Sequence, residues 1–305
     1  MCCLYGFLHY GSNEIKDLKE ITNALSKEAT ERGTDAAGIA YNDNDRLHIY
    51  KEAKSAENIE FKHSDKIIAL TGHTRHSTQG SEKRNYNNHP FSGKCKNVKF
   101  ALAHNGVLMN DKELRKKYHL PKTKIETDSY IAVQLLEYKK LLNEESIKFM
   151  AEALEGSFSF SILDSSDTLW LVKGDSPLHI LHFPKLNLYI YASTEEILWK
   201  GLIETEIFDE LKNGNFEEIP MHCGDILNIL PDGNIVYSKF DYKGYCGYGF
   251  KDWWDYGMYS NDTNSYIDDL KAVAAFEGIC PDEIDYLAAN GFTPEEIEEY
   301  IYCYE

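Results

Sequence analysis

The chain has 305 residues, 43% of them hydrophobic, and is therefore long enough to bury a full core. A formal net charge of −18 argues against binding to nucleic acid or to an anionic membrane, because both repel a strongly acidic surface. Much of the acidic excess lies in residues 251–305, which hold fourteen Asp and Glu residues against two Lys. This stretch is compatible with a solvated tail or with a docking site for a basic protein partner.

Seven cysteines, an odd number, show neither the spacing of a zinc site nor that of a disulfide framework. No apolar run approaches the ~20 residues that span a bilayer, and no signal peptide precedes Cys2. We therefore expect a protein of the reducing cytoplasm that holds no metal and no other cofactor.

The hydrophobic pattern predicts a strand at residues 2–10 and a helix at 13–31 that ends before Gly33. Strands are predicted at 36–42, 46–52, 67–75 and 98–104, and helices at 126–140 and 144–154. Alternating runs follow at 157–163, 168–174, 178–183 and 188–193, then a helix at 194–204 and a hairpin around 231–233. Because the strands cluster without regular β-α alternation, the pattern indicates an α+β protein with antiparallel sheets and helices on their faces.

The chain beyond residue 240 divides into two segments of different composition. Residues 241–263 are rich in glycine and aromatic residues, which indicates a linker or a strap on the main domain. Residues 264–305 are acidic and predict short amphipathic helices, with a capping box from Thr293 to Glu296 and a helix end at Asn290-Gly291. About 40 residues rarely hold a stable core alone, so these helices are expected to pack on the main domain or on a partner.

The thiol of Cys2 is the first candidate for chemistry. If Met1 is removed, the thiol and a free α-amino group share one residue. An α-amino pKa of ~7.7–8 suits that group to accept the thiol proton and later to protonate a leaving group. Taken alone, Cys2 is better explained as a small residue in an edge strand.

The run from Gly72 to Gly80, GHTRHSTQG, places Arg75 where an apolar strand enters a polar loop. The guanidinium group suits a carboxylate, such as that of an amino acid, although a surface Arg after a strand is also compatible. His73 and His76 are possible metal ligands, but no nearby residues complete a metal site.

Two further motifs contain candidate polar groups. In Ala103-His104-Asn105-Gly106, the Asn105 amide and the Gly106 N–H are suited to an oxyanion hole, or the pair forms an ordinary turn. In Glu126-Thr127-Asp128-Ser129, the Asp128 carboxylate is suited either to capping a helix or to holding a substrate ammonium.

Together and in this order, these motifs resemble those of the class II glutamine amidotransferases, which belong to the N-terminal nucleophile (Ntn) hydrolases. The motifs are Cys2, RGTDAAGI at 32–39, GHTRHSTQG at 72–80, AHNG at 103–106 and ETDS at 126–129. Glucosamine-6-phosphate synthase and amidophosphoribosyltransferase carry such a domain, and the resemblance covers residues 2–240.

The resemblance implies a four-layer αββα sandwich of two antiparallel sheets and a glutaminase that acts on L-glutamine. It implies that Cys2 is the nucleophile, and that Asn105 and Gly106 form the oxyanion hole. It further implies that Arg75 binds the α-carboxylate and Asp128 the α-ammonium, while Thr78 lines the pocket and Arg32 supports the N-terminal residue. The chain departs from the family at Cys3, where glycine is usual, and at His76, where an aromatic residue usually follows the pocket Arg.

About 65 residues follow the resembling region, too few for a synthase domain that consumes ammonia. The sequence therefore predicts a glutaminase that supplies ammonia to a synthase subunit in trans. Two alternatives remain open, a free-standing Ntn amidohydrolase acting on glutamine or γ-glutamyl compounds, and a non-catalytic glutamine-sensing or docking protein.

Overall fold

The computed structural model describes residues 2–11, 15, 18–96, 98–203, 205–243, 267, 270–271, 273–274, 279–290, 292–293, 296–297 and 300–301. The expected linker or strap at 241–263 therefore lies outside the described residues apart from 241–243. The expected helices at 264–305 are described only in part.

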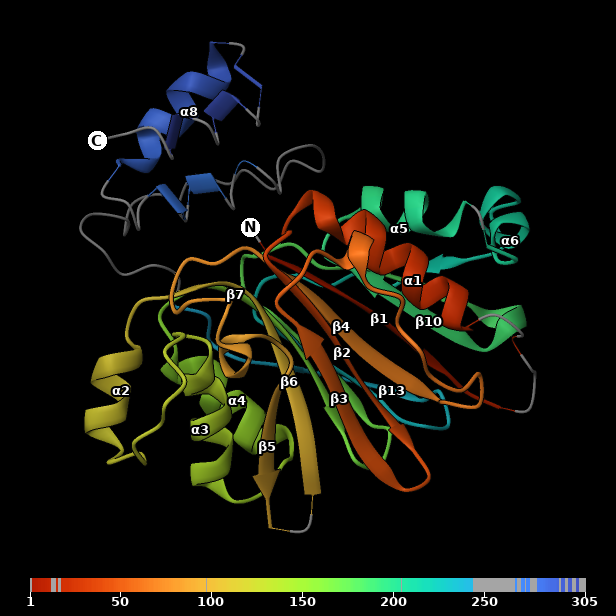
Figure 1. Cartoon of the computed structure of the whole chain (residues 1–305), viewed down its shortest axis with the longest axis horizontal. Coiled ribbons are helices and arrows are strands. Elements are labelled where there is room, and N and C mark those ends of the chain that lie inside the picture. Colours follow the sequence, from red (N-terminus) through yellow and green to blue (C-terminus); the bar gives the residue numbers. More distant parts are fainter. Residues whose placement is uncertain are drawn as a thin grey trace.

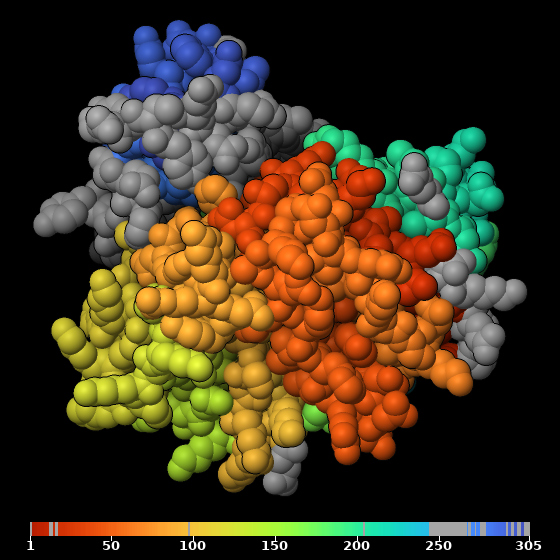
Figure 2. Space-filling view, viewed as in Figure 1, coloured from red at the N-terminus to blue at the C-terminus, as the bar shows by residue number. Residues whose placement is uncertain are grey.

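The first sheet has the strand order β11-β9-β10-β1-β4-β2-β3, with every neighbouring pair antiparallel. Its strands are β1 (Cys3–His9), β2 (Ala36–Asp43), β3 (Arg46–Glu52), β4 (Ala69–Arg75), β9 (His179–Phe183), β10 (Leu188–Ala192) and β11 (Glu217–Glu218). The N-terminal strand β1 therefore lies in the middle of this sheet, between β10 and β4. Edge strand β3 alternates between exposed and half-buried residues, and its orange surface is visible in the space-filling view (Figure 2).

The second sheet has the strand order β13-β12-β8-β7-β6-β5 and is also antiparallel. Its strands are β5 (Phe91–Cys95), β6 (Val98–Leu108), β7 (Gly156–Asp164), β8 (Leu169–Lys173), β12 (Asp225–Ile229) and β13 (Ile235–Lys239). The hairpin expected around residues 231–233 is confirmed, because it joins β12 to β13.

Helices cover the outer face of each sheet (Figure 1). The first sheet carries α1 (Leu18–Glu28), α5 (Glu195–Leu202) and α6 (Phe208–Lys212), and the second carries α3 (Tyr130–Lys139) and α4 (Glu144–Ala153), with α2 (Asp111–Lys117) beside them. Short 3-10 turns lie at Ala29–Glu31, Ala56–Asn58, Asn85–Asn87 and Pro184–Leu186, and α8 (Pro281–Ala289) belongs to the C-terminal part.

Three apolar cores hold these layers together. One lies between the first sheet and α1 and α5, another between the second sheet and α3 and α4, and the third between the two sheets. The side chains alternate accordingly along β1, because successive residues of a strand point to opposite faces. Tyr5 and Phe7 enter the helix-side core, whereas Leu4 and Leu8 enter the core between the sheets. The expected four-layer αββα sandwich of two antiparallel sheets is confirmed.

The elements missed by the sequence pattern are short or mostly polar. Helix α2 buries only Asp111 and Leu114, so its sequence has no continuous apolar stripe. Strand β5 has the alternating burial of a strand, but it is only five residues long. The helix expected at 126–140 begins only at Tyr130, and the Asp128 carboxylate before it accepts a hydrogen bond from the Leu108 N–H of β6 at 2.6 Å.

The C-terminal part has a small apolar core of its own. Its members all lie between residues 267 and 301, and they are Ile267, Leu270, Val273, Ala274, Ile279, Ile284, Ile297 and Ile301. The expected capping box is confirmed, since Thr293 N donates to Glu296 Oε2 at 2.8 Å and Glu296 N donates to Thr293 Oγ1 at 3.3 Å.

Candidate active site

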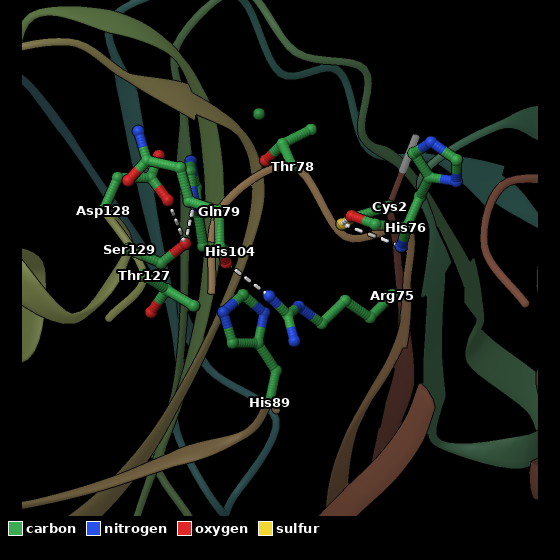
Figure 3. A pocket seen from close by; sticks show the side chains of 11 residues that line it. Cys2, Arg75, His76, Thr78, Gln79, His89, His104, Thr127, Asp128 and Ser129 are labelled. Atoms are coloured by element: carbon green, nitrogen blue, oxygen red, sulfur yellow. Dashed lines mark hydrogen bonds between the residues drawn. The ribbon is translucent and has the colours of Figure 1, made fainter. Parts of the chain in front are cut away.

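A pocket lies where residues from both sheets meet at one end of the sandwich. It is lined by Cys2, Arg75, His76, Thr78, Gln79, His89, His104, Gly106, Thr127, Asp128 and Ser129 (Figure 3). Charged and polar residues make up most of this lining, which suits a polar ligand. Residues from four of the expected motifs therefore meet in one place, although they are spread over more than a hundred residues of sequence.

Strand alternation explains why these side chains converge. Cys2 precedes β1 and shares the inward parity of Leu4, while Cys3 points into the helix-side core and is completely buried. On the neighbouring strand β4, Thr71 reaches Ser161 of the second sheet at 2.5 Å, and His73 and Arg75 share its parity. The interior between the sheets thus receives both the thiol and the guanidinium group.

The Cys2 thiol is held at the start of the loop that follows β4. Its Sγ lies 3.4 Å from the His76 backbone N and 3.5 Å from the His76 backbone O. Burial raises the pKa of this thiol, and the His76 N–H and the Arg75 charge act in the opposite direction. A proton acceptor close to Sγ is therefore needed to make the thiol reactive near neutral pH.

Arg75 is a buried cation whose hydrogen-bond partners are neutral. It donates to Asn88 Oδ1 at 2.7 Å, to Gln79 O at 2.6 Å and to Gly80 O at 2.7 Å, and its side chain extends away from Cys2 toward His89 (Figure 3). Within the described part of the chain, no carboxylate forms an ion pair with it. A buried charge without a counter-charge is costly, so this group is suited to an anionic ligand.

Asp128 supplies a carboxylate on the side of the pocket away from Cys2 (Figure 3). Its Oδ2 accepts from Leu108 N at 2.6 Å, and its Oδ1 accepts from Ser129 Oγ at 3.3 Å. Burial raises the pKa of this carboxyl group, while these hydrogen bonds lower it. A cationic ligand would stabilise the ionised form.

Gly106 lines the pocket in a backbone conformation that other residues rarely adopt. Its φ is +128°, and a Cβ placed there would lie 2.1 Å from the Ser157 backbone O. Asn105 is buried beside it but does not line the pocket, and its Nδ2 lies 3.4 Å from Ser193 Oγ. Gly106 thus lines the cavity itself, and the adjacent Asn105 amide is held by Ser193.

The RGTD motif supports the loop that carries the pocket residues. Arg32 Nε donates to the Cys2 backbone O at 3.0 Å, which holds the residue that bears the thiol. A Cβ on Gly33 would lie 2.5 Å from the Arg75 backbone carbon, so only glycine allows this close packing. Asp35 Oδ2 accepts from Ser77 N at 2.7 Å and fixes the start of the loop.

Three buried histidines beside the pocket were not expected as a group. His73 Nε2 lies 2.9 Å from the His104 backbone O and 2.8 Å from His89 Nδ1, and His104 Nδ1 lies 2.8 Å from Ser129 Oγ. Burial lowers the pKa of His73 and His89 far below the usual value, and lowers the pKa of His104 to about 3. All three imidazoles are therefore neutral at physiological pH.

Among the described residues, His, Cys, Asp and Glu side chains form no group of three or more that is suited to a metal ion. In the same part of the chain, no helix is both long and apolar enough to cross a membrane.

The family and the relatives that this chain resembles in sequence agree with one another. Residues 73–200 match the family described as a glutamine amidotransferase domain. Glutamine--fructose-6-phosphate aminotransferase [isomerizing] from Staphylococcus aureus is 33% identical over 250 residues, which cover 77% of this chain and 38% of the relative. The same enzyme from Staphylococcus epidermidis is 32% identical over 192 residues, which cover 58% of this chain and 30% of that relative. The chain thus spans well under half the length of these relatives.

Solved structures share the fold. Glutamine phosphoribosylpyrophosphate amidotransferase from B. subtilis superposes with a TM-score of 0.60 at 22% identity, covering 79% of this chain and 49% of that one. A structure described as the allosteric regulatory enzyme of purine biosynthesis gives 0.61 at 20% identity, with the same coverage.

The two antiparallel sheets with helices on their outer faces form the four-layer sandwich that these structures share. With the family match and the staphylococcal relatives, the chain carries an enzyme domain of the class II glutamine amidotransferase family.

Proposed function

We propose that this chain is a glutaminase that hydrolyses the side-chain amide of L-glutamine to glutamate and ammonia. The observation that carries the proposal is the single pocket shared by the Cys2 thiol, a buried cation and a buried carboxylate. The charges of Arg75 and Asp128 are opposite to those at the two ends of an α-amino acid. A thiol at the far end of the pocket suits attack on the δ-carbonyl of glutamine.

In the proposed reaction, removal of Met1 frees the Cys2 α-amino group, which takes the thiol proton. The sulfur attacks the δ-carbonyl carbon, and the resulting oxyanion is stabilised by the Gly106 N–H and the Asn105 amide. The carbon–nitrogen bond then breaks, and the amino group returns the proton so that ammonia leaves. A γ-glutamyl thioester remains, which water hydrolyses with the amino group acting as base, giving glutamate and the free thiol.

In the same scheme, Arg75 binds the α-carboxylate and Asp128 the α-ammonium, while His76 and Thr78 line the substrate pocket. Arg32 holds the Cys2 carbonyl so that the thiol and the amino group stay oriented. We divide the chain into a glutaminase domain at 2–240, a connecting segment at 241–263 and an acidic helical segment at 264–305.

We further propose that the ammonia is passed to a synthase subunit in trans, in a reducing cytoplasm that keeps Cys2 as a thiol. The support is that the staphylococcal relatives are more than twice as long as the matched region. A free-standing amidohydrolase is the second candidate, favoured by a pocket whose described lining residues all lie between positions 2 and 129.

The decisive experiment measures ammonia release from glutamine by the purified chain, together with its intact mass. We expect turnover only from molecules that lack Met1, because the retained residue ties up the proposed base in a peptide bond. Cys2→Ala is the control and should lower kcat by about four orders of magnitude or more. Equal turnover by the parent and Cys2→Ala would refute the proposal, and glutamine binding without any turnover would favour a sensing role.

A further inference from the structure

Asn88 is buried against the guanidinium group of Arg75 and is fully hydrogen-bonded. Its Oδ1 accepts from Arg75 Nη1 at 2.7 Å, and its Nδ2 donates to Glu82 O at 2.8 Å and to Asn85 Oδ1 at 3.2 Å. The Nδ2 contacts fix which way the amide faces, because an amide oxygen cannot donate to the Glu82 carbonyl. The carbonyl of Asn88 is therefore the end that faces Arg75.

The backbone around Asn88 is also held in place. The Lys51 Nζ of β3 donates to the backbone O of Asn88 and, at 3.0 Å, to that of Pro90. Burial and the nearby charge of Arg75 lower the pKa of Lys51 to about 8. The segment that presents Asn88 is thus tied to the first sheet, which makes the position of its side chain well defined.

The charge on Arg75 is left without a direct counter-charge by this arrangement. Its three hydrogen-bond acceptors are one side-chain amide and two backbone carbonyls. Asp35, Asp128 and Glu82 influence its pKa only as nearby charges. An aspartate at position 88 would have nearly the same shape as the asparagine, but it would neutralise the guanidinium group from within the protein.

We propose that Asn88 is a positioning residue that orients Arg75 through a neutral oxygen and so reserves its charge for the carboxylate of the substrate. The inference rests on the proposed function for the kind of ligand, an α-amino acid, and adds the residue that sets selectivity for its carboxylate. It requires the pocket to prefer L-glutamine to its α-amide, which has the same size but no α-carboxylate.

The test compares binding of L-glutamine and of its α-amide by calorimetry in a Cys2→Ala background, which needs no turnover. Asn88→Asp should lower the affinity for glutamine by about tenfold or more, because the new carboxylate competes for Arg75. The affinity for the α-amide should stay nearly unchanged. Asn88→Ala leaves Arg75 less well oriented, and it should lower the preference for glutamine over the α-amide by a smaller factor than Asn88→Asp. This second variant keeps the test valid if Asn88→Asp does not fold.

Asn87→Ala is the matched control, because Asn87 is an adjacent buried amide that bonds Glu126 and Ser81 rather than Arg75. It should preserve the ratio of the two affinities. An unchanged ratio in Asn88→Asp and Asn88→Ala, or an equal fall in Asn87→Ala, overturns the inference. If the parent chain turns over glutamine but the ratio is unchanged in the Asn88 variants, only the role of Asn88 is refuted. If the ratio shifts in the Asn88 variants but the parent chain does not turn over glutamine, only the proposed glutaminase activity is refuted. If neither ligand binds, both the glutaminase activity and the role of Asn88 are refuted.

Discussion

Cys2 and Cys3 are neighbours in sequence but lie in different environments. Cys2 lines the pocket and is partly accessible, whereas Cys3 is completely buried and its Sγ donates to the Leu4 backbone O at 3.2 Å. Burial raises the pKa of the Cys3 thiol, which further disfavours its reactive thiolate. The cysteine at a position where the family usually has glycine is therefore a core residue of this chain and is shielded from the pocket.

We predict that Cys3→Ala retains kcat within about a factor of three, while its unfolding free energy falls by about 1 kcal/mol through lost packing. Glutamine turnover and urea unfolding measure the two effects separately. Alkylation of the native protein by iodoacetamide, followed by peptide mass analysis, should modify Cys2 far faster than Cys3. Faster modification of Cys3, or loss of turnover in a stably folded Cys3→Ala, would contradict this prediction.

The neutral histidines make stability depend on pH. The unfolded chain binds a proton at each histidine below pH ~6.5, whereas folded His104 does so only near its pKa of about 3. The unfolded state therefore binds more protons as the pH falls, and the unfolding free energy decreases by up to about 1.4 kcal/mol per pH unit for each such group. His73 and His89 act in the same direction.

We predict that urea unfolding at a series of pH values from about 7.5 to about 5 shows this decline, and that His104→Gln has a shallower slope. Glutamine cannot take up a proton, so the contribution of one histidine is removed. His48→Gln, the same substitution at an exposed histidine of edge strand β3, is the matched control for the change of side chain itself. A slope in His104→Gln equal to that of the parent would show that His104 does not contribute.

At the scale of elements, the sequence predicts individual strands better than their contacts. Most strands were expected, because apolar residues that alternate along the sequence indicate a strand with at least one buried face. The order of motifs also identified Cys2, Arg75, Thr78 and Asp128, and each of them lines the pocket. His89 and His104 were not expected there, because their positions depend on which strand ends meet across the two sheets. Asn88 was missed for the same reason, since its partner Arg75 lies on another segment.

Ser193 links three elements at the pocket end of the sandwich. It follows β10, its Oγ accepts from Leu4 N of β1 at 2.9 Å, and Asn105 Nδ2 of β6 lies 3.4 Å from the same oxygen. Its backbone N donates to Leu4 O at 2.9 Å, so β1 remains paired even without the hydroxyl group. The hydroxyl therefore sets the position of the Asn105 amide relative to the strand that carries Cys2.

We predict that Asn105→Ala lowers kcat by about 10²-fold with little change in KM, as expected for a donor that acts mainly in the transition state. Ser193→Ala should lower kcat in the same direction by about tenfold, because the amide stays but loses its anchor. Ser161→Ala is the matched control, since Ser161 is an equally buried serine between the sheets that contacts Thr71 instead. Steady-state kinetics on all three variants measure these effects. If Ser161→Ala lowered kcat as much as Ser193→Ala, the role of Ser193 in holding the Asn105 amide would be contradicted.

At the scale of the whole molecule, the C-terminal segment has the features of a separate unit. Its described apolar residues form a core of their own. Two polar contacts lie within the same segment, Lys271 to Asp285 at 2.5 Å and Tyr300 Oη to Glu283 Oε1 at 2.6 Å. The three cores of the sandwich contain no described residue beyond position 242. Stability of the sandwich is therefore expected to be independent of this segment.

We predict that deleting residues 264–305 shifts the melting temperature of the sandwich by less than about 3 °C and leaves glutamine turnover within about twofold. The reason is that the described residues of the three sandwich cores and of the pocket all lie before residue 264. Differential scanning calorimetry and ammonia release measure these two quantities. A matched variant is Ile284→Asp in the full chain, which places a charge in the centre of the C-terminal core, where Ile284 is completely buried. It should abolish the structure of the segment and likewise spare turnover. If either change unfolds the sandwich or abolishes turnover, the segment stabilises the glutaminase domain, and its acidic helices are then a cap on that domain rather than a unit free to dock a partner.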